Sequence, residues 1–347
     1  MEPGAPMNRR TFLTGAAASL AAPARIGTGI LCIQHSHLAG KLKAMRGNPD
    51  YEVLAVCEPD DELRRRRAAD PQFAGLRWMP MDELLATRSI DLIVFEGEVR
   101  DAISYGRRVL EAGKHLHLEK PPTHLLEPFR ELVELARRRS LRLQLGYLWR
   151  FHAGFDAALA ACRNGWLGDV YMLRATVNSD RDMEQRAVEA RFRGGSMFEL
   201  GGHVIDRIVA LLGRPDRVRP WLRHDTSLPD SVNGNTLAVF EYANTLAVVA
   251  SSNRDPAMHR CFEAIGSDGS VRVEPVEPAP TLRVQLRQAR GPYEKGVQDI
   301  ALPPQPRFVK DFEDLARAIK TGTPLKYSYD HELSLQETLL RASGELA

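Results

Sequence analysis

The chain has 347 residues, 44% of them hydrophobic, which is enough to build two domains with separate cores. Its 47 basic and 45 acidic residues are intermixed and leave a net charge of +2, so the charge pattern does not indicate a nucleic-acid-binding protein. No apolar stretch approaches the roughly 20 residues that span a bilayer, so we expect no membrane span.

The first 24 residues have the features of an export signal. Arg9 and Arg10 precede Phe12 and Leu13, a segment of small apolar residues, and an Ala-Pro-Ala sequence at 22–24 that suits a signal peptidase. This stretch resembles a twin-arginine signal, which directs a folded protein out of the cytoplasm. We therefore expect an exported, periplasmic or extracytoplasmic protein, with a cytoplasmic one as the alternative.

Residues 25–148 alternate between apolar strands and amphipathic helices. Strands are expected at 30–34, 52–58, near Trp78, and at 90–97, 115–122 and 142–150, with helices at 38–47, near Arg64 to Arg67, and at 81–87, 99–113 and 128–140. This alternation is typical of an α/β fold with a Rossmann-like, doubly wound parallel sheet. Its ligand crevice is expected at the carboxyl ends of the strands.

The pattern changes in the second half. Between residues 149 and 305 we expect an α+β domain with a large, open, mainly antiparallel sheet, because long strand-like runs are interleaved with only one or two helices, at 154–164 and 203–212. Residues 242–245 and 267–269 are predicted to form hairpin turns.

The last segment, residues 306–347, is predicted to be helical. One face of its first helix carries Phe308, Phe312, Leu315 and Ile319, and Gly322 follows as a helix end. Because such an apolar face needs a partner, we expect these helices to pack partly on the first domain.

The loop after the first strand has an unusual composition. Gln34, His35, Ser36 and His37 stand where a dinucleotide-binding loop has glycines. A His-x-His sequence also occurs at metal sites of eight-unit barrels, but the sheet-rich second half argues against a barrel. The four cysteines form no Cys-x-x-Cys pair, and His115-x-His117 is interpreted as part of a buried strand. We therefore predict no metal site and interpret the loop as an altered dinucleotide loop.

Three motifs stand out in this layout: AGKHLHLEKPP at 112–122, GGSMFELGGHVIDRIVALLG at 194–213, and GSDG at 266–269. The first resembles an AGKHVxxEKP signature, the second a GGGxxxDxGxHxxDxxxxLxG segment, and the third a late GxxG hairpin. All three belong to the family of glucose-fructose oxidoreductase, inositol dehydrogenase and the rhizopine-catabolism proteins (Gfo/Idh/MocA). The resemblance covers nearly the whole chain after residue 25.

Candidate catalytic residues follow from the chemistry and from this resemblance. Oxidation of a secondary alcohol needs a base for the hydroxyl proton and a cation that stabilises alkoxide character. His203 and Lys120 are the right chemical types, and the resemblance implies these roles for them. Asp206, one helical turn after His203, is expected to support them. Tyr147 and Arg150, at the end of the last strand of the first domain, are candidates to contact substrate oxygens.

The resemblance also implies bound NAD, with NADP as the alternative. Alignment places Gln34, Ser36 and Ala39 on the family's Gly-x-Gly-x-x-Ala positions, and Ser36 is a candidate to cap the next helix and bind a phosphate. Glu58 stands where an acidic residue holds the adenosine ribose, which favours NAD, while the arginines at 64–67 keep NADP open. A cis peptide is expected before Pro121. The candidate cofactor contacts are Gln34, Ser36, His37, Glu58, Glu96, Glu119 and Pro121.

We therefore expect an NAD(P)-dependent oxidoreductase that acts on a secondary hydroxyl of a sugar, polyol or related carbohydrate. One alternative is a glycoside hydrolase or lyase that oxidises a sugar carbon transiently with tightly held NAD. Another is a noncatalytic sugar-binding or assembly protein without cofactor, because the loop lacks glycines and Glu96 and Glu98 stand near the expected pyrophosphate. The resemblance further implies a homodimer or homotetramer formed through the second sheet.

Overall fold

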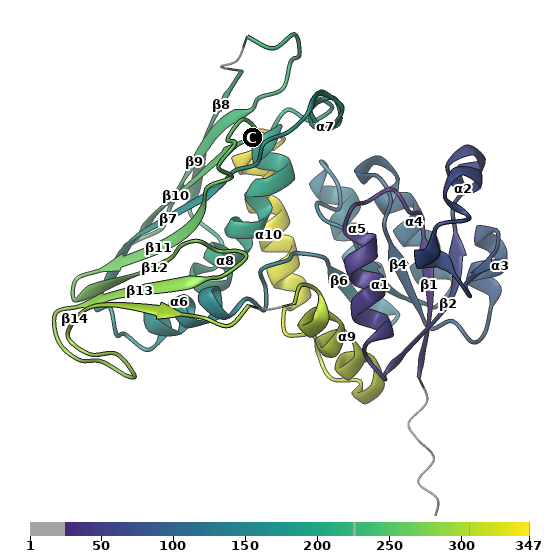
Figure 1. Cartoon of the computed structure of the whole chain (residues 1–347), viewed down its shortest axis with the longest axis horizontal. Coiled ribbons are helices and arrows are strands. Elements are labelled where there is room, and N and C mark those ends of the chain that lie inside the picture. Colours follow the sequence, from purple (N-terminus) through teal and green to yellow (C-terminus); the bar gives the residue numbers. More distant parts are fainter. Residues whose placement is uncertain (1–24, 225–226, 305, 347) are drawn as a thin grey trace, which may run out of the picture.

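The computed structural model describes residues 25–224, 227–304 and 306–346, so the predicted export signal lies outside the described residues. The described chain forms a six-stranded and an eight-stranded sheet. Figure 1 shows the two sheets on opposite sides of the molecule, with the C-terminal helices α9 (Val309–Thr321) and α10 (Tyr329–Ala342) in the middle. The predicted fold class, a Rossmann-like parallel sheet followed by a mainly antiparallel one, is confirmed.

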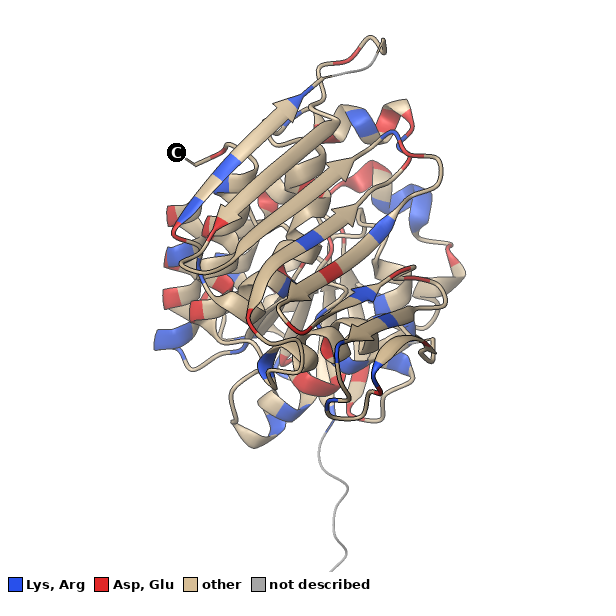
Figure 2. Ribbon diagram, turned by 90° about the vertical axis from the view of Figure 1, so that its left-hand side faces the viewer, with Lys and Arg blue, Asp and Glu red and all other residues tan. Residues whose placement is uncertain are grey.

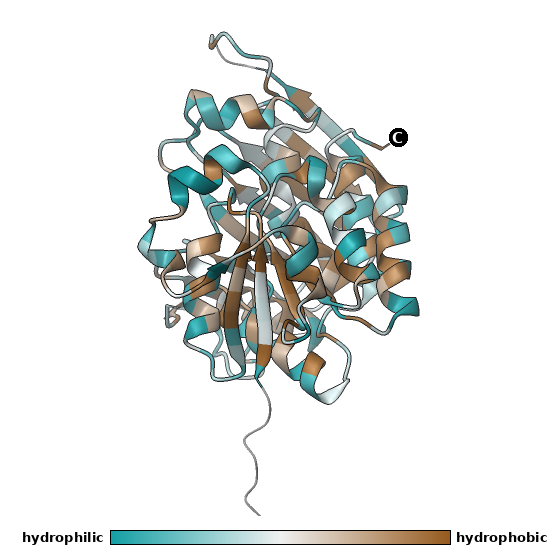
Figure 3. Cartoon of the chain, turned by 90° about the vertical axis from the view of Figure 1, so that its right-hand side faces the viewer, coloured by the Kyte–Doolittle hydropathy of each residue, from teal (hydrophilic) through white to brown (hydrophobic). Residues whose placement is uncertain are grey.

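The first sheet has the strand order β3-β2-β1-β4-β5-β6 and is parallel throughout. Its strands are β1 (Ile26–Leu31), β2 (Tyr51–Cys57), β3 (Arg77–Trp78), β4 (Leu92–Phe95), β5 (His115–Leu118) and β6 (Leu143–Leu145). Both β1 and β4 are buried along their whole length, because helices cover both faces of the sheet. Figure 3 shows these central strands as the most hydrophobic part of this domain. From β1 the sheet extends through β2 to β3 on one side and through β4 to β6 on the other. The ligand crevice of such a sheet lies at this switch point, between β1 and β4.

The first strand begins earlier than its hydrophobic run predicts. The strand expected at 30–34 instead covers Ile26–Leu31, so Gly27 and Gly29 lie inside it. A Cβ on Gly27 would come within 1.6 Å of the carbonyl oxygen of Ser89, and one on Gly29 within 2.8 Å of Leu84 Cδ1. These glycines therefore allow close packing of the strand and take no part in a phosphate loop.

The helices of the first domain connect successive parallel strands. They are α1 (Leu38–Arg46), α2 (Asp61–Arg67), the 3-10 turn η1 (Pro71–Phe73), α3 (Met81–Ala86), α4 (Val99–Glu111) and α5 (Leu126–Arg138). Asp60 caps α2 by accepting hydrogen bonds from the amides of Glu62 and Leu63. The order of strands and helices predicted for this half is confirmed.

The second sheet has the strand order β14-β13-β12-β11-β7-β10-β9-β8. Its strands are β7 (Val170–Val177), β8 (Arg217–Arg223), β9 (Asn235–Glu241), β10 (Leu246–Ser252), β11 (Arg260–Gly266), β12 (Gly269–Val273), β13 (Thr281–Leu286) and β14 (Gly296–Ala301). Only the β7–β10 pair is parallel among these neighbours. The predicted turns at 242–245 and 267–269 do connect antiparallel partners.

One face of this sheet is covered and the other is open. Helices α6 (Ala153–Arg163) and α8 (Gly202–Leu212) pack against the covered face. Alternate residues of β9 and β10 are accordingly buried, as expected for a sheet with one face on the core. Figure 2 looks onto the open face, which no helix covers.

Three elements of the second half were not predicted from the pattern. These are α7 (Met183–Glu189), the π-helical turn η2 (Met197–Gly201) and the edge strand β14. Asp182 and Gln185 form a capping box at the start of α7, a signal that the sequence does contain. The π-helical turn runs directly into α8, so the two form one continuous helical segment.

The two C-terminal helices contact both domains. The hydroxyl of Tyr51 in β2 donates to the carbonyl of Phe312 in α9 at 2.6 Å, and Gln336 in α10 donates to the carbonyl of Thr123 at 2.6 Å. Helix α10 also packs along α8. Residues from the end of the chain therefore lie between the sheets.

In the described part of the chain, no helix combines the length and apolarity needed to cross a membrane. All four cysteines are unpaired, and Cys32 and Cys57 are buried. His115 and His117 lie in β5, and His117 is buried as predicted.

Candidate active site

The loop that follows β1 is tied to the ends of two neighbouring strands. The amides of Gln34 and His35 both donate to the carbonyl of Glu96, at 3.0 and 2.9 Å, directly after β4. The amide of Ile33 donates to Glu58 Oε2 at 2.9 Å, directly after β2. The loop therefore lies at the switch point between β1 and β4, where an open parallel sheet binds its ligand.

Exposed and half-buried side chains alternate along this loop. Gln34 and Ser36 are exposed, whereas His35 and His37 are half-buried. The N-cap of α1 is His37 and no side chain caps the helix, so the predicted capping role of Ser36 is wrong: Ser36 lies one residue too early. The amides of Ser36, Ala39 and Gly40 donate to no partner within the described chain. They remain available to a phosphate at the helix N-terminus.

Glu58 stands at the end of β2 and is almost fully buried. Its Oε2 accepts the amide of Ile33 and its Oε1 accepts the amide of Asp60, both at 2.9 Å. Burial raises the pKa of this carboxyl, while the two amides act in the opposite direction. Glu58 thus supports the loop and presents a carboxylate where a dinucleotide places its adenosine ribose.

A buried ion cluster lies beneath the loop. Lys41, near the start of α1, is fully buried and contacts the carboxylates of both Glu96 and Glu119. These carboxylates follow the neighbouring strands β4 and β5, which brings them together. Burial raises the pKa of Glu96 to about 8. Glu98 turns away and pairs with Arg191 at 2.9 Å, so these acidic side chains do not crowd the expected pyrophosphate site.

Glu119 also contacts two histidines. Its Oε2 lies 3.2 Å from His37 Nδ1 and 3.7 Å from His35 Nδ1, while its Oε1 accepts the amide of Lys120 at 2.9 Å. Burial acts to raise the pKa of Glu119, but His35, Lys41 and His37 hold it well below its usual range. Burial also lowers the pKa of His37, and it lowers that of His35 to about 4. Both imidazoles are therefore neutral near pH 7.

Lys120 forms an ion pair across the two domains. Its Nζ lies 2.9 Å from Glu199 Oε1 and donates to the Glu199 carbonyl at 3.0 Å. The expected cis peptide precedes Pro121, which is buried. Burial acts to raise the pKa of Glu199, but Lys120 holds it below its usual value. Glu199 belongs to the π-helical turn, a distortion that is frequent at functional sites.

His203 lies beside this pair in the first turn of α8. Its ring is 5.8 Å from that of Tyr147 and 5.4 Å from that of Trp149. Three buried atoms, His203 Nδ1, Tyr147 Oη and Trp149 Nε1, have no hydrogen-bond partner within the described chain. Burial, then Lys120 and His37, hold the pKa of His203 well below its usual value. The site therefore contains a neutral imidazole and polar atoms that a ligand can pair.

Asp206 and Arg150 belong to a separate, saturated network. Arg150 binds Asp206 Oδ1 at 3.0 Å and both oxygens of Glu332 at 2.5 and 2.6 Å. Arg207 and His331 complete the set around Asp206. Burial opposes ionisation of Asp206, but Arg150 and Arg207 hold its pKa well below its usual range. The structure therefore pairs Asp206 with arginines, and it buries Arg150 among carboxylates.

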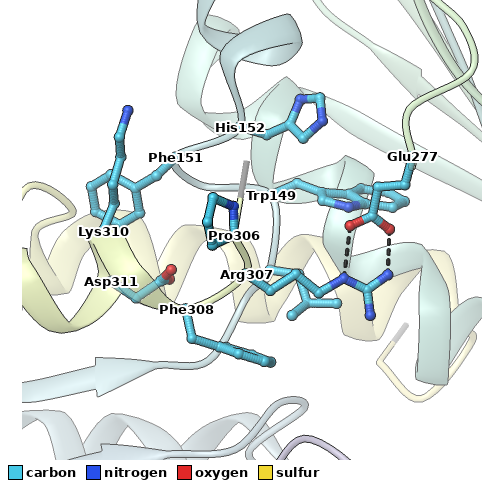
Figure 4. Close-up of a pocket in the computed structure, with 10 residues that line it drawn as sticks. Trp149, Phe151, His152, Glu277, Pro306, Arg307, Phe308, Lys310 and Asp311 are labelled. Carbon is cyan, nitrogen blue, oxygen red and sulfur yellow. Dashed lines mark hydrogen bonds and ion pairs between the residues drawn. The ribbon is translucent and has the colours of Figure 1, made fainter. Parts of the chain in front are cut away.

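A small cavity is lined by Trp149 and by residues 306–308, which precede α9. Its volume is about 20 Å³, and Figure 4 shows His152, Asp311 and the Arg307–Glu277 ion pair around it. A cavity of this size holds a water molecule and no sugar. A larger groove of about 850 Å³ begins at Ser36 and His37 and runs between α1 and α9.

Three site residues were not predicted from the sequence. Glu199 stands at the acidic position of the GGGxxxDxGxH segment, four residues before His203, which was a usable signal. Lys41 was assigned only to a helix, and its burial depends on two distant carboxylates. Trp149 was expected in a strand, but β6 ends at Leu145 and Trp149 lies in the turn that follows.

Family models match both halves of the chain. Residues 24–147 match the model described as oxidoreductase family, NAD-binding Rossmann fold, and residues 155–272 match the GFO/IDH/MocA C-terminal domain. The sheet order and the site thus define an oxidoreductase with an NAD-binding domain. The chain belongs to the Gfo/Idh/MocA family of oxidoreductases.

Known relatives include enzymes of sugar metabolism. The chain is 28% identical over 251 residues to dTDP-3,4-didehydro-2,6-dideoxy-alpha-D-glucose 3-reductase of Streptomyces violaceoruber, a match that covers 70% of this chain and 72% of that protein. Its fold resembles KijD10, a 3-ketoreductase from Actinomadura kijaniata in complex with TDP-benzene and NADP, with a TM-score of 0.75, 20% identity and coverage of 92% and 96%. GenD2 from gentamicin A biosynthesis, in complex with NAD, gives a TM-score of 0.75 at 19% identity, with coverage of 94% and 95%.

The residues present fit a dinucleotide. The free amides at the start of α1 suit a pyrophosphate, and the Glu58 carboxylate suits ribose hydroxyls. The family's glycines are absent, but the Lys41 ammonium pairs with the carboxyl groups of both Glu96 and Glu119 below the loop. These amides and Glu58 would hold an NAD(P), which would supply hydride-transfer chemistry to this site.

Proposed function

We propose that this protein transfers hydride between NAD(P) and a secondary hydroxyl, or the corresponding ketone, of a carbohydrate. The observation that carries the proposal is the Lys120–Glu199 pair beside a buried, neutral His203 at the edge of the NAD-binding sheet. The sugar named in the Streptomyces violaceoruber relative supports the substrate class. Tyr147 and Trp149 offer further hydrogen-bonding atoms to a polyhydroxylated ligand.

Each residue has a distinct role in this proposal. When bound, the nicotinamide accepts or supplies the hydride. The Lys120 ammonium donates to the reacting oxygen and stabilises its alkoxide character. Glu199 accepts a hydrogen bond from this ammonium and so orients it. In oxidation, His203 takes the hydroxyl proton as hydride leaves the carbon; in reduction, it returns that proton to the oxygen.

Asp206 and Arg150 act as positioning residues in this account. The network of Asp206, Arg150 and Glu332 joins α8 and α10 to the chain just after β6. That chain segment carries Tyr147 and Trp149, and α8 carries His203. The network therefore fixes the distance between the two sides of the site without contacting the substrate.

Glu58 favours NAD over NADP. Its carboxylate would repel a 2′-phosphate, and it already accepts two backbone amides that hold it in place. The arginines of α2 are engaged locally, since Arg64 pairs with Asp61 and Arg67 with Asp70. We expect NAD to bind at least tenfold more tightly than NADP.

The proposal is tested by turnover with a panel of sugars, polyols and nucleotide sugars, with reduced nicotinamide measured by absorbance. His203→Asn should lower kcat by roughly 10²–10⁴-fold without loss of NAD binding. His259→Ala, which changes an exposed histidine, is the matched control. A protein that binds NAD but oxidises or reduces no member of the panel would contradict the proposal.

The same experiment separates the lyase alternative. A hydrolase or lyase that oxidises the sugar transiently returns the hydride, so product accumulates without net reduced nicotinamide. Lys120 and His203 would serve either reaction, so mass analysis of the products against reduced nicotinamide decides between them. Equal amounts of oxidised sugar and NADH are expected.

We propose that two copies of the chain pair through the open face of the eight-stranded sheet (Figure 2). The side chains of Trp221 and Leu246 on this face are 50% and 43% exposed, and Arg219 and Glu241 supply both charges beside them. Light scattering should give a dimer or tetramer, and Trp221→Glu with Leu246→Glu should give a monomer. Leu125→Glu, at an exposed apolar residue of the first domain, should not change the mass. A monomeric wild-type protein would exclude this interface.

We also propose export through the twin-arginine sequence at residues 9 and 10. Cell fractionation of the full chain should place it outside the cytoplasm. Arg9→Lys together with Arg10→Lys should retain it inside, because the paired arginines are the recognised feature of such a signal. Equal distribution of both forms would contradict export by this route.

A further inference from the structure

Three side chains with metal-binding atoms meet at the end of the first and fifth strands. His35, His37 and Glu119 each offer a ligand atom, and these atoms all lie within 4.8 Å of one another. The two imidazole rings are 4.4 Å apart, and both Nδ1 atoms face the same carboxylate oxygen, Glu119 Oε2. One donor atom from each residue thus points to a common small space.

The donor set is that of a transition-metal site. Two neutral imidazoles and one carboxylate are the ligands of many zinc enzymes, where the remaining positions stay open to a water or substrate. The Glu119 carboxylate is anchored from outside, since the Lys120 amide donates to its other oxygen at 2.9 Å. Ligating carboxylates are commonly held by such outer hydrogen bonds.

A glycine allows the chain to pass close to the Glu119 carboxylate. A Cβ on Gly146 would come within 3.3 Å of Glu119 Oε2 and 3.2 Å of Lys41 Nζ. His35 and His37 retain partial exposure, with 22% and 15% of their side chains accessible, whereas Glu119 is 3% exposed. An ion could therefore reach the site from the crevice and find its anionic ligand already in place.

Lys41 is the competing cation. Its ammonium contacts the same oxygen of Glu119 and also Glu96. A metal on Glu119 needs Lys41 to shift toward Glu96, whose second oxygen has no hydrogen-bond partner within the described chain. His35 would also exchange the hydrogen bond that its Nδ1 accepts from the His37 amide for the metal.

We infer that His35, His37 and Glu119 bind a divalent transition-metal ion of the Zn²⁺ class. This inference goes beyond the proposed hydride transfer, which assigns no metal to the protein. The metal content can also be measured independently of NAD binding. Lys120 directly follows Glu119, and its amide donates to Glu119 Oε1, so a bound ion would be near the reactive pair. The sequence contained this site in part, as His-x-His, but the third ligand comes from a strand more than 80 residues later.

The test uses the full chain freed of metal with a chelator and then titrated with Zn²⁺ by calorimetry. One ion per chain is expected, and Co²⁺ in its place should give the visible absorption of a low-coordinate nitrogen and oxygen site. His35→Ala with His37→Ala, and separately Glu119→Gln, should each weaken Zn²⁺ binding at least about tenfold. His259→Ala, at an exposed histidine beside Asp255, should leave it unchanged.

A second variant tests the competition directly. Lys41→Met with Glu96→Gln removes the ammonium and its other partner together, so Zn²⁺ should bind more tightly than to the wild type. Circular dichroism of each variant checks that the chain remains folded.

Absence of stoichiometric Zn²⁺ binding, or binding that survives loss of both histidines, would overturn the inference. Neither result would affect NAD binding, which is titrated on the same samples. Conversely, one Zn²⁺ per chain in a protein that binds no dinucleotide would support the metal site and contradict the proposed hydride transfer.

Discussion

Two clusters of buried polar side chains meet at the start of α8, and they differ in how completely their atoms are paired. Around Asp206, the described residues Arg150, Arg207, Glu332 and His331 provide a partner for each charge. Around His203, three buried atoms have none within the described chain. Buried polar atoms are normally paired. The saturated cluster therefore contributes to stability, and the unsaturated one leaves polar atoms available to a ligand.

The largest expected effect is on the saturated cluster. Arg150→Met should lower the free energy of unfolding by roughly 3–5 kcal/mol, because it leaves Asp206 and Glu332 buried without their shared cation. Arg283→Met removes an exposed arginine that also binds its carboxylate through two atoms, and should cost much less, because solvent screens that pair. Urea unfolding measures both. Equal losses would show that burial of the network is unimportant.

The unsaturated cluster should respond in activity instead. Lys120→Met should lower kcat by roughly 10²–10³-fold, because the reacting oxygen loses its cationic donor. Lys114→Met is the matched control, since Lys114 lies before the same strand and donates to the carbonyls of Thr87 and Ile90, away from the site. Steady-state kinetics with NAD in excess measure the difference. Undiminished turnover by Lys120→Met would remove this residue from the reaction.

Asp311 is a buried carboxyl that belongs to neither cluster, so it tests what burial alone does to a carboxyl group (Figure 4). Burial raises its pKa from 3.8 to about 7. The folded chain therefore holds a proton that the unfolded chain has released, so this group's contribution to stability falls as pH rises from about 4 to about 7. Asp311→Asn should raise the free energy of unfolding above pH 7 by roughly 1–3 kcal/mol.

The measurement is urea unfolding of the wild type and of Asp311→Asn across this pH range. The two curves should converge below about pH 3, where Asp311 is protonated in both states. Glu313→Gln, at a neighbouring position of α9, should not reproduce the gain. Parallel curves at all pH values would show that the Asp311 carboxyl titrates normally.

The smallest expected effect concerns substrate binding. Trp149→Phe keeps the ring that packs on Phe155 and removes the unpaired Nε1. The loss of one hydrogen bond of about 0.5–1.5 kcal/mol should raise KM severalfold and leave kcat nearly unchanged. Trp166→Phe, which packs on Tyr293, is the control. A change in kcat alone would indicate that Trp149 positions His203 and does not contact the substrate.

Much of the fold could be predicted because its strands and helices alternate with clear periodicity. The six parallel strands follow from this alternation, and the open sheet follows from the change in pattern after residue 148. The start of β1 was misjudged because Gly27 and Gly29 interrupt its apolar run. Strand β14, which carries polar and exposed residues, gave no periodic signal.

The site was less predictable because its residues are paired by tertiary contacts. Lys120 and His203 could be found from local motifs and from the chemistry of alcohol oxidation. The partners of Arg150 could not, since Glu332 lies 182 residues later in the sequence. Asp206 shares a helix with His203, but its surroundings are set by Arg150, Arg207 and His331, from three different parts of the chain.

The account depends most directly on whether the altered loop holds a dinucleotide beside Lys120 and His203. Protein purified from the cytoplasm should be analysed by mass spectrometry for released nucleotide and titrated with NAD and NADP. We predict one NAD per chain, bound more tightly than NADP and weakened by Glu58→Gln. A folded protein that neither retains nor binds either dinucleotide would contradict the proposed hydride transfer.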